Sequence, residues 1–169
     1  STVAKLQILS NLREYEVMRK KDLKRVGMSI VRVEAIRKVG GFDNTISGAG
    51  EDADLTGRIR SAGYLLCLGE GQFEHEERQT WSGIWSQNFW YGYGMHYLSH
   101  KKRSLVNLRL RFLPISFAEG IIRSILAFVG IRKIICFLLP FFNMFKATAW
   151  WWGFLNAHKR GYGHVKRNH

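Results

Sequence analysis

The spacing of apolar residues along the chain predicts three helices before any motif is considered. Over Val3–Met18 an apolar residue recurs at every third position with polar residues between, which is typical of an amphipathic helix. A short helix is expected over Glu34–Val39, because Gly40-Gly41 provides a stop after it. Trp81–Lys101 repeats an aromatic residue at every fourth position, which predicts a long helix with one aromatic face.

A fourth helix is predicted to begin at Glu51, directly after a glycine-containing loop. Leu55 and Ile59 lie one turn apart on its apolar face, and Ala62-Gly63 ends it because glycine adopts the left-handed conformation without strain. The loop Gly48-Ala49-Gly50 leaves room for a ligand to approach the backbone. The chain therefore presents two adjacent carboxylates at a loop–helix junction.

Two short apolar segments, Met28–Val33 and Tyr64–Leu68, are predicted to be strands that flank these helices. Within the long aromatic helix, Gly92 and Gly94 are poor helix formers, so they mark a kink or a close contact between backbones. The pattern up to about residue 104 thus predicts helices together with two short strands.

The last third of the chain is far more apolar, and we place a domain boundary near residue 105. Glu119 and Arg123 pair one turn apart on the polar side of an apolar helical face. The following segment Ile134–Leu155 spans a bilayer only if Lys146 is tolerated within it. An interfacial or re-entrant helical hairpin is the expectation, with spanning as the alternative. Residues 105–160 are thus predicted to attach to a membrane, followed by a basic tail, 161–169.

The net charge of the chain indicates an anionic partner. The formal net charge is +13 and the isoelectric point is near 10.1, which favours nucleic acid, anionic lipid or a phosphorylated substrate. A nucleic-acid-binding protein ranks low, because the basic residues are dispersed and no recognition motif is present. Cys67 and Cys136 lie in apolar surroundings without metal-type spacing, so they are expected to be reduced packing residues.

One set of residues, in order and spacing, resembles the acceptor-side half of a family 2 glycosyltransferase. The resemblance covers roughly residues 25–100 and rests on Val39-Gly40-Gly41-Phe42-Asp43, Gly50-Glu51-Asp52-Ala53-Asp54-Leu55, Arg58, Ala62-Gly63-Tyr64 and His75. It implies an α/β fold of the GT-A type, a Rossmann-like mixed sheet with helices on both faces. It also implies inverting transfer of a sugar from a nucleotide sugar, with Mg²⁺ or Mn²⁺.

The same resemblance assigns the two central carboxylates. Asp52 is implied to be the general base, a role that suits a carboxylate because the acceptor hydroxyl loses its proton as it attacks the anomeric carbon. Glu51 is implied to hold the loop or to bind the acceptor. Residue chemistry alone leaves a simpler explanation open, since carboxylates at a helix start are stabilised by the helix dipole, by roughly 0.3–1 kcal/mol.

The resemblance implies less specific roles for five other residues. Gly50, Arg32, Arg78 and Trp81 are expected to bind substrate, and His75 to ligate the metal. The motif of processive relatives is not met, because Gln79 follows the arginine instead of preceding it, so a single-sugar transferase is expected.

No segment of residues 1–25 fits the donor-binding half of that family. The chain is therefore expected to be the C-terminal part of a longer transferase and to lack most of the donor site. The predicted protein acts at the cytoplasmic face of the cell membrane, with a nucleotide-sugar donor, a lipid-linked or glycan acceptor, and membrane lipids as partners. The alternative is a non-catalytic membrane-interaction module.

Overall fold

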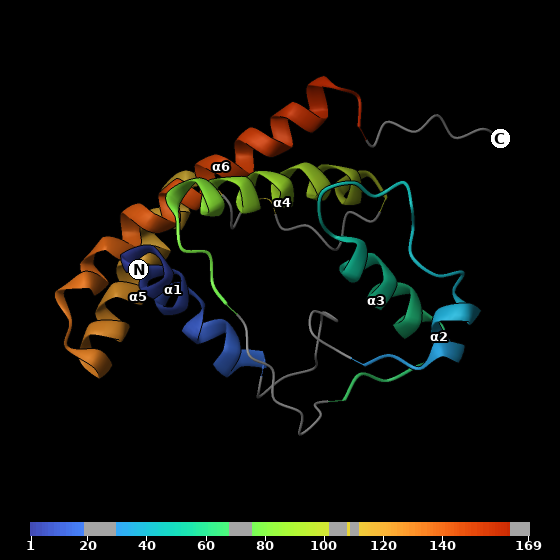
Figure 1. The fold of residues 1–169 in the computed structure, drawn as a ribbon, viewed down its shortest axis with the longest axis horizontal. Coiled ribbons are helices and arrows are strands. Elements are labelled where there is room, and N and C mark those ends of the chain that lie inside the picture. Colours follow the sequence, from blue (N-terminus) through green and yellow to red (C-terminus); the bar gives the residue numbers. More distant parts are fainter. Residues whose placement is uncertain (19–29, 68–75, 102–107, 109–111, 163–169) are drawn as a thin grey trace.

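In the computed structural model, all regular elements of the described residues are helices. The structure describes residues 1–18, 30–67, 76–101, 108 and 112–162. Helices α4 and α6 lie side by side, α1 and α5 lie at their N-terminal ends, and α2 and α3 lie near the C-terminal end of α4 (Figure 1). The elements are α1 (Thr2–Met18), α2 (Val33–Lys38), α3 (Glu51–Ser61), α4 (Trp81–Lys101), α5 (Leu113–Ile131), the 3₁₀ helix η3 (Ile134–Leu138) and α6 (Leu139–Lys159).

The helices predicted from apolar spacing are confirmed. Helix α4 has the expected bounds, and α2 ends where Gly40 and Gly41 take positive φ angles of 78° and 76°. Helix α3 ends at Ser61, and Gly63 after it adopts a φ of 91°. These features depend on residues within a few positions of one another, which is why sequence spacing suffices to locate them.

The predicted α/β fold is wrong for the described part of the chain, which contains no strand and therefore no Rossmann-like sheet. Residues 30–32 and 64–67, the described parts of the two predicted strands, are irregular, and α2 already begins at Val33. Ile30 and Leu65 are 96% and 89% exposed. A strand is stable only beside other strands that satisfy its backbone groups, and these two segments do not pair with each other.

Two separate clusters of buried apolar residues lie in the described part of the chain. The larger one joins α1, α4 and α6 and consists of Val3, Leu6, Ile84, Leu139 and Phe142. The smaller one joins α2 and α3 through Ala35, Leu55 and Ile59. Because α2 and α3 have little apolar area of their own, the polar contacts that join them to α4 become important for their position.

Helices α4 and α6 run in the same direction and approach so closely that glycine is required at the crossing. A Cβ atom on Gly92 would lie 1.8 Å from the carbonyl oxygen of Trp150, and a Cβ atom on Gly153 would lie 1.9 Å from that of Phe89. The predicted close backbone contact at Gly92 is confirmed. The same holds at Gly94, where a Cβ atom would lie 1.8 Å from the carbonyl oxygen of Ala49 in the loop before α3.

Helix α5 turns its apolar side outward. Its buried positions are Ser116, Gly120 and Ser124, and the predicted ion pair between Glu119 and Arg123 is present at 2.6 Å. The large apolar side chains are exposed, namely Ile121, Ile122, Ile125, Leu126 and Val129. Small and polar residues inside with large apolar residues outside are typical of helices that pack together in lipid, where apolar surface gains nothing from burial against protein.

Two segments of the described chain are long and apolar enough to cross a membrane, judged by length and composition alone. They are α5 and the stretch Ile134–Lys159 that contains η3 and α6. Lys146, the charge within the second segment, donates a hydrogen bond to Ser10 of α1 at 3.1 Å, so it is held inside the helical bundle. Membrane association is therefore supported in general form, while the domain boundary near residue 105 stays a prediction.

Candidate functional site

The candidate site lies at the first turn of α3. Gly50 enters the helix with a φ of 109°, and the backbone N–H of Asp54 donates to the carbonyl of Gly50 at 2.9 Å to close the first turn. Glu51, Asp52 and Asp54 all belong to this turn, where unpaired N–H groups and the helix dipole favour negative charge. The structure gives these neighbouring carboxylates different surroundings.

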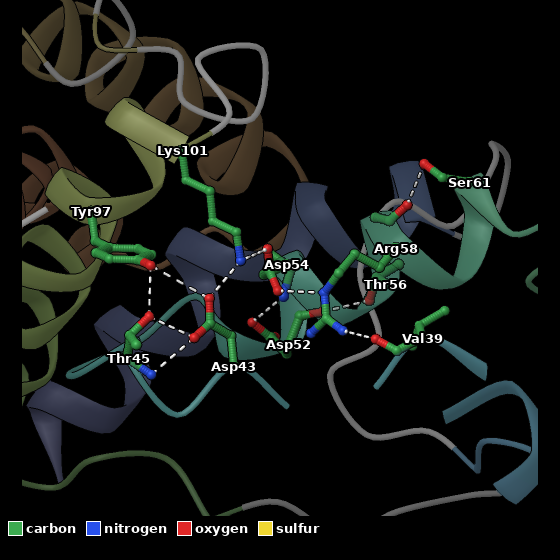
Figure 2. Close-up of polar contacts among 12 residues, drawn as sticks. Val39, Asp43, Thr45, Asp52, Asp54, Thr56, Arg58, Ser61, Tyr97 and Lys101 are labelled. Carbon is green, nitrogen blue, oxygen red and sulfur yellow. Dashed lines mark hydrogen bonds and ion pairs between the residues drawn. The ribbon is translucent and has the colours of Figure 1, made fainter. Parts of the chain in front are cut away.

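Asp54 is the buried carboxylate and holds α3 in place. It accepts a hydrogen bond from Arg58 Nε at 2.8 Å and forms an ion pair with Lys101 Nζ at 2.8 Å, while Arg58 also donates to the carbonyl of Val39 at 2.6 Å (Figure 2). One carboxylate therefore joins α3 to the last turn of α4 and, through Arg58, to the end of α2. Asp54 therefore holds three helices together through its two ion pairs.

Asp43, in the Gly-Gly-Phe-Asp turn, meets Lys101 from the other side. Lys101 Nζ lies 2.6 Å from its carboxylate, and the backbone N–H of Thr45 donates to it at 2.9 Å. The Thr45 hydroxyl bridges Asp43 and the hydroxyl of Tyr97, as Figure 2 shows. Lys101 thus links two segments that sequence spacing places far apart, and we name Asp43, Asp54, Arg58 and Lys101 the ionic lock.

The ionic lock shifts the proton affinity of its members. The hydrogen bond from Lys101, followed by the one from Thr45, holds the pKa of Asp43 well below its ordinary value of 3.8. Burial alone would lower the pKa of Lys101, but its hydrogen bonds to Asp43 and Asp54 outweigh burial and raise that pKa above 10.5. Lys101 is therefore a cation at neutral pH.

This arrangement predicts a specific acid sensitivity. Because the pKa of Asp43 is lower in the folded than in the unfolded chain, its ion pair stabilises the fold above about pH 3.8, and this stability is lost as the pH falls toward the folded-state pKa. We expect Lys101→Met to flatten the dependence of the free energy of unfolding on pH below about pH 5. Urea unfolding followed by circular dichroism over a pH series measures that slope.

The matched control for this prediction is Lys159→Met. Lys159 occupies the last turn of α6, as Lys101 occupies that of α4, but it is exposed and forms no ion pair among the described residues. We expect it to keep the wild-type slope. Equal slopes in all three proteins would show that the ionic lock does not contribute to stability.

Asp52 differs from both members of the lock. Its carboxylate accepts a hydrogen bond from the backbone N–H of Ala53 at 2.7 Å and forms no ion pair within the described ranges. The residue is half-buried, and its neighbour Glu51 is exposed. Of the carboxylates in this region, Asp52 and Glu51 are the ones whose charge is not already neutralised by a lysine or an arginine.

The glycine loop before α3 is packed against α4, and this changes the interpretation of Gly50. A Cβ atom on Gly50 would lie 2.5 Å from Leu98 Cδ1, and one on Gly48 would lie 2.8 Å from the carbonyl oxygen of Trp90. The small size of both residues is therefore used for packing against protein. Gly50 is buried, and its substrate-binding role stays a prediction.

Tyr162, just after α6, closes the other side of this loop. Its hydroxyl accepts a hydrogen bond from the backbone N–H of Ser47 and donates to the carbonyl of Thr45 at 3.2 Å, and its ring stacks on Tyr93 with centroids 4.9 Å apart. Burial raises the pKa of Tyr162 above 10.0. The C-terminal end of α6 thus contacts the loop that leads to Asp52.

The other predicted site residues lie elsewhere or are not described. Arg32 is exposed at the N-terminal cap of α2, and Arg78 is exposed just before α4. Trp81 packs on α6, with its ring 5.2 Å from that of Phe145, at the end of α4 opposite Lys101, about 30 Å away by helix rise. The structure does not bring Arg78 and Trp81 to Asp52, and their roles stay predictions. His75 lies outside the described residues.

The predicted metal has no donor set in the described part of the chain. Asp43 and Asp54 are already paired with cations of the ionic lock, and no three histidine, cysteine or acidic side chains among the described residues are arranged to hold an ion. The described residues therefore do not fit a Mg²⁺ or Mn²⁺ site by themselves.

No protein-family model, curated protein or solved structure matches the chain. Any function assigned to it therefore depends on the chemistry of its own residues. Sequence inspection missed Lys101, Tyr97 and Tyr162 as parts of the site. The spacing of Tyr97 and Lys101, one turn apart at the end of a helix, is a weak signal, but nothing in the sequence pairs them with Asp43.

Proposed function

We propose that this chain supplies the acceptor-side part of a membrane-bound, inverting glycosyltransferase in which Asp52 is the general base. The observation that carries the proposal is a division among the carboxylates near the start of α3 into those that are ion-paired and those that are not. Asp43 and Asp54 are neutralised by the ionic lock, whereas Asp52 on the same turn as Asp54 keeps an unpaired charge.

This division suits general-base catalysis. A base must accept a proton, and a carboxylate whose oxygens are engaged by a lysine and an arginine accepts one poorly. A base must also be held in place, and the ionic lock fixes the turn of α3 that carries Asp52. Asp52 therefore combines an available oxygen with a rigid support.

The proposed reaction is a single displacement. The Asp52 carboxylate takes the proton of an acceptor hydroxyl as that oxygen forms a bond to the anomeric carbon of the donor sugar. The bond from that carbon to the nucleoside diphosphate breaks, the diphosphate leaves with the electron pair, and the configuration inverts. In this proposal Arg78 is the candidate among the described residues for binding the diphosphate, and the remaining groups, including the ligands of any Mg²⁺ or Mn²⁺, lie outside them.

The outward apolar side of α5 supports a lipid-linked or surface glycan acceptor at the membrane. Exposed residues such as Ile125 and Val129 favour contact with acyl chains, and basic residues such as Arg132 and Lys133 favour anionic headgroups. A helical anchor in the same chain would hold Asp52 near the membrane in which such an acceptor lies. The alternative, a non-catalytic membrane module, is supported by the same apolar surface and assigns no function to Asp52.

The test is sugar transfer by the native-length protein in liposomes that contain membrane lipids as acceptors. A panel of labelled nucleotide sugars is supplied with Mg²⁺ or Mn²⁺, and label in extracted lipid is counted. We expect transfer from at least one donor. Absence of transfer from every donor, with the protein still bound to the liposomes, would reject the transferase and favour the membrane module.

A further inference from the structure

We infer that α4 and α6 lie along the surface of the bilayer as a pair and that neither crosses it. This inference rests on the membrane association in the proposed function, and it goes further by fixing the orientation. It concerns both helices because they pack against each other along their length, from Trp81 beside Phe145 to His96 beside Phe154.

The path of the chain between α3 and α4 carries the argument. Asp54 of α3 is bound to Lys101, so α3 begins at the C-terminal end of α4. The chain must then return to Trp81 at the opposite end of α4, about 30 Å away by helix rise. Residues 64–80 make this return. If α4 and α6 crossed the membrane, this segment would have to cross it as well.

Residues 64–80 cannot cross a bilayer. The described parts, 64–67 and 76–80, are not helical, and most of residues 76–80 are exposed. Non-helical backbone that faces lipid leaves its polar groups unsatisfied, at a cost of several kcal/mol for each group. Residues 68–75 number only eight, whereas about 20 helical residues are needed to cross the hydrocarbon core with their backbone groups satisfied. The segment also contains five charged residues: Glu70, Glu74, Glu76, Glu77 and Arg78.

The exposed aromatic residues agree with the same orientation. Tryptophan and tyrosine prefer the headgroup region, so a crossing helix carries them near its ends. Trp90 and Tyr91 are exposed at the middle of α4, where a crossing helix would place them at the bilayer centre. In a helix that lies along the surface, residues at its middle can lie in the headgroup region.

Charge at the two ends of the pair gives a third, independent indication. Arg132 and Lys133 lie just before η3 and α6, while Lys159 and Arg160 lie at the opposite end. A crossing pair commonly shows an excess of lysine and arginine on one side. Basic residues at both ends suit a pair whose two ends meet the same anionic headgroups. The expected partner is therefore the surface of an anionic bilayer.

Cysteine labelling from one side of the membrane tests this orientation. In a background of Cys67→Ser and Cys136→Ala, single variants Ser82→Cys and Lys159→Cys mark opposite ends of the pair, and both positions are exposed. The native-length protein is added to preformed vesicles of phosphatidylglycerol and phosphatidylcholine. A membrane-impermeant maleimide is then supplied outside, or trapped in the lumen in a parallel sample.

We expect the outside reagent to label both positions and the lumenal reagent to label neither. Glu34→Cys on α2 is the matched control, because it is exposed and belongs to the aqueous part in either orientation. Each end should be labelled within about twofold of this control. If the lumenal reagent labels one of the two ends, the inference is overturned. It is also overturned if both ends are protected from the outside reagent while Glu34→Cys reacts.

Sedimentation with the vesicles separates this inference from the proposed function. Protein that stays in solution would remove membrane association and the orientation together. Protein that sediments, transfers sugar and yet is labelled from the lumen at one end would leave the transferase intact and reject only the orientation. Circular dichroism of each variant confirms that the helices are retained before labelling is compared.

Discussion

Gly153→Leu is expected to separate α4 from α6 and to lower the free energy of unfolding by more than about 3 kcal/mol. The Cβ atom alone would lie 1.9 Å from the carbonyl oxygen of Phe89, and that atom is backbone. A helix backbone cannot move aside locally, so the whole of α4 must shift. Because α4 also positions Lys101, the loss of the close contact between α4 and α6 is expected to weaken the ionic lock at the C-terminal end of α4. Urea unfolding followed by circular dichroism measures the effect.

Gly130→Leu is the matched control for this variant. Gly130 also lies in a long apolar helix, α5, but no atom lies within 4 Å of a Cβ atom built on it. Since leucine favours helices more than glycine does, we expect unchanged or slightly increased stability. Similar behaviour of the two variants would show that the glycine contact between α4 and α6 is not required for stability.

Asp52→Asn is expected to lower the rate of sugar transfer by a factor of about 10² to 10⁴, the usual contribution of a general base. Asparagine has the same shape, and its amide oxygen can accept the hydrogen bond from the Ala53 N–H that Asp52 accepts now. The fold of α3 should therefore persist while the proton acceptor is lost. Initial rates with saturating donor and acceptor, together with circular dichroism, measure both quantities.

Glu34→Gln serves as the control for Asp52→Asn. Glu34 is an exposed carboxylate in the first turn of α2, so it matches Asp52 in helix position and loses the same charge. We expect it to transfer sugar at the wild-type rate. If Asp52→Asn is as active as Glu34→Gln, Asp52 is not the base.

The sequence was sufficient for the helices and insufficient for the fold class. The apolar spacing of α1, α3 and α4 is local, and the structure confirms each of them. The predicted strands depend on pairing with distant segments, which no local pattern reports. Ile30 and Leu65 lie on irregular segments. The α/β prediction failed because it required strand partners for these segments, and the local pattern does not reveal whether such partners exist.

Contacts between segments far apart in the chain were the second feature that could not be predicted from the sequence. The periodicity of α5 located its apolar face, but a face that points to lipid and a face that points to a protein core have the same spacing. Gly92 was expected to approach another backbone, yet only the structure identifies Trp150 as the partner. Lys101 joins residues 58 and 47 positions away, so its role could not be read from spacing.

The anomeric configuration of the first product tests the central claim most directly. The product of transfer by the native-length protein is examined by proton NMR, with the donor sugar as reference. A single displacement assisted by Asp52 predicts a product whose anomeric configuration is opposite to that of the donor. A product that retains the donor configuration would contradict a mechanism in which Asp52 deprotonates the attacking hydroxyl in one displacement.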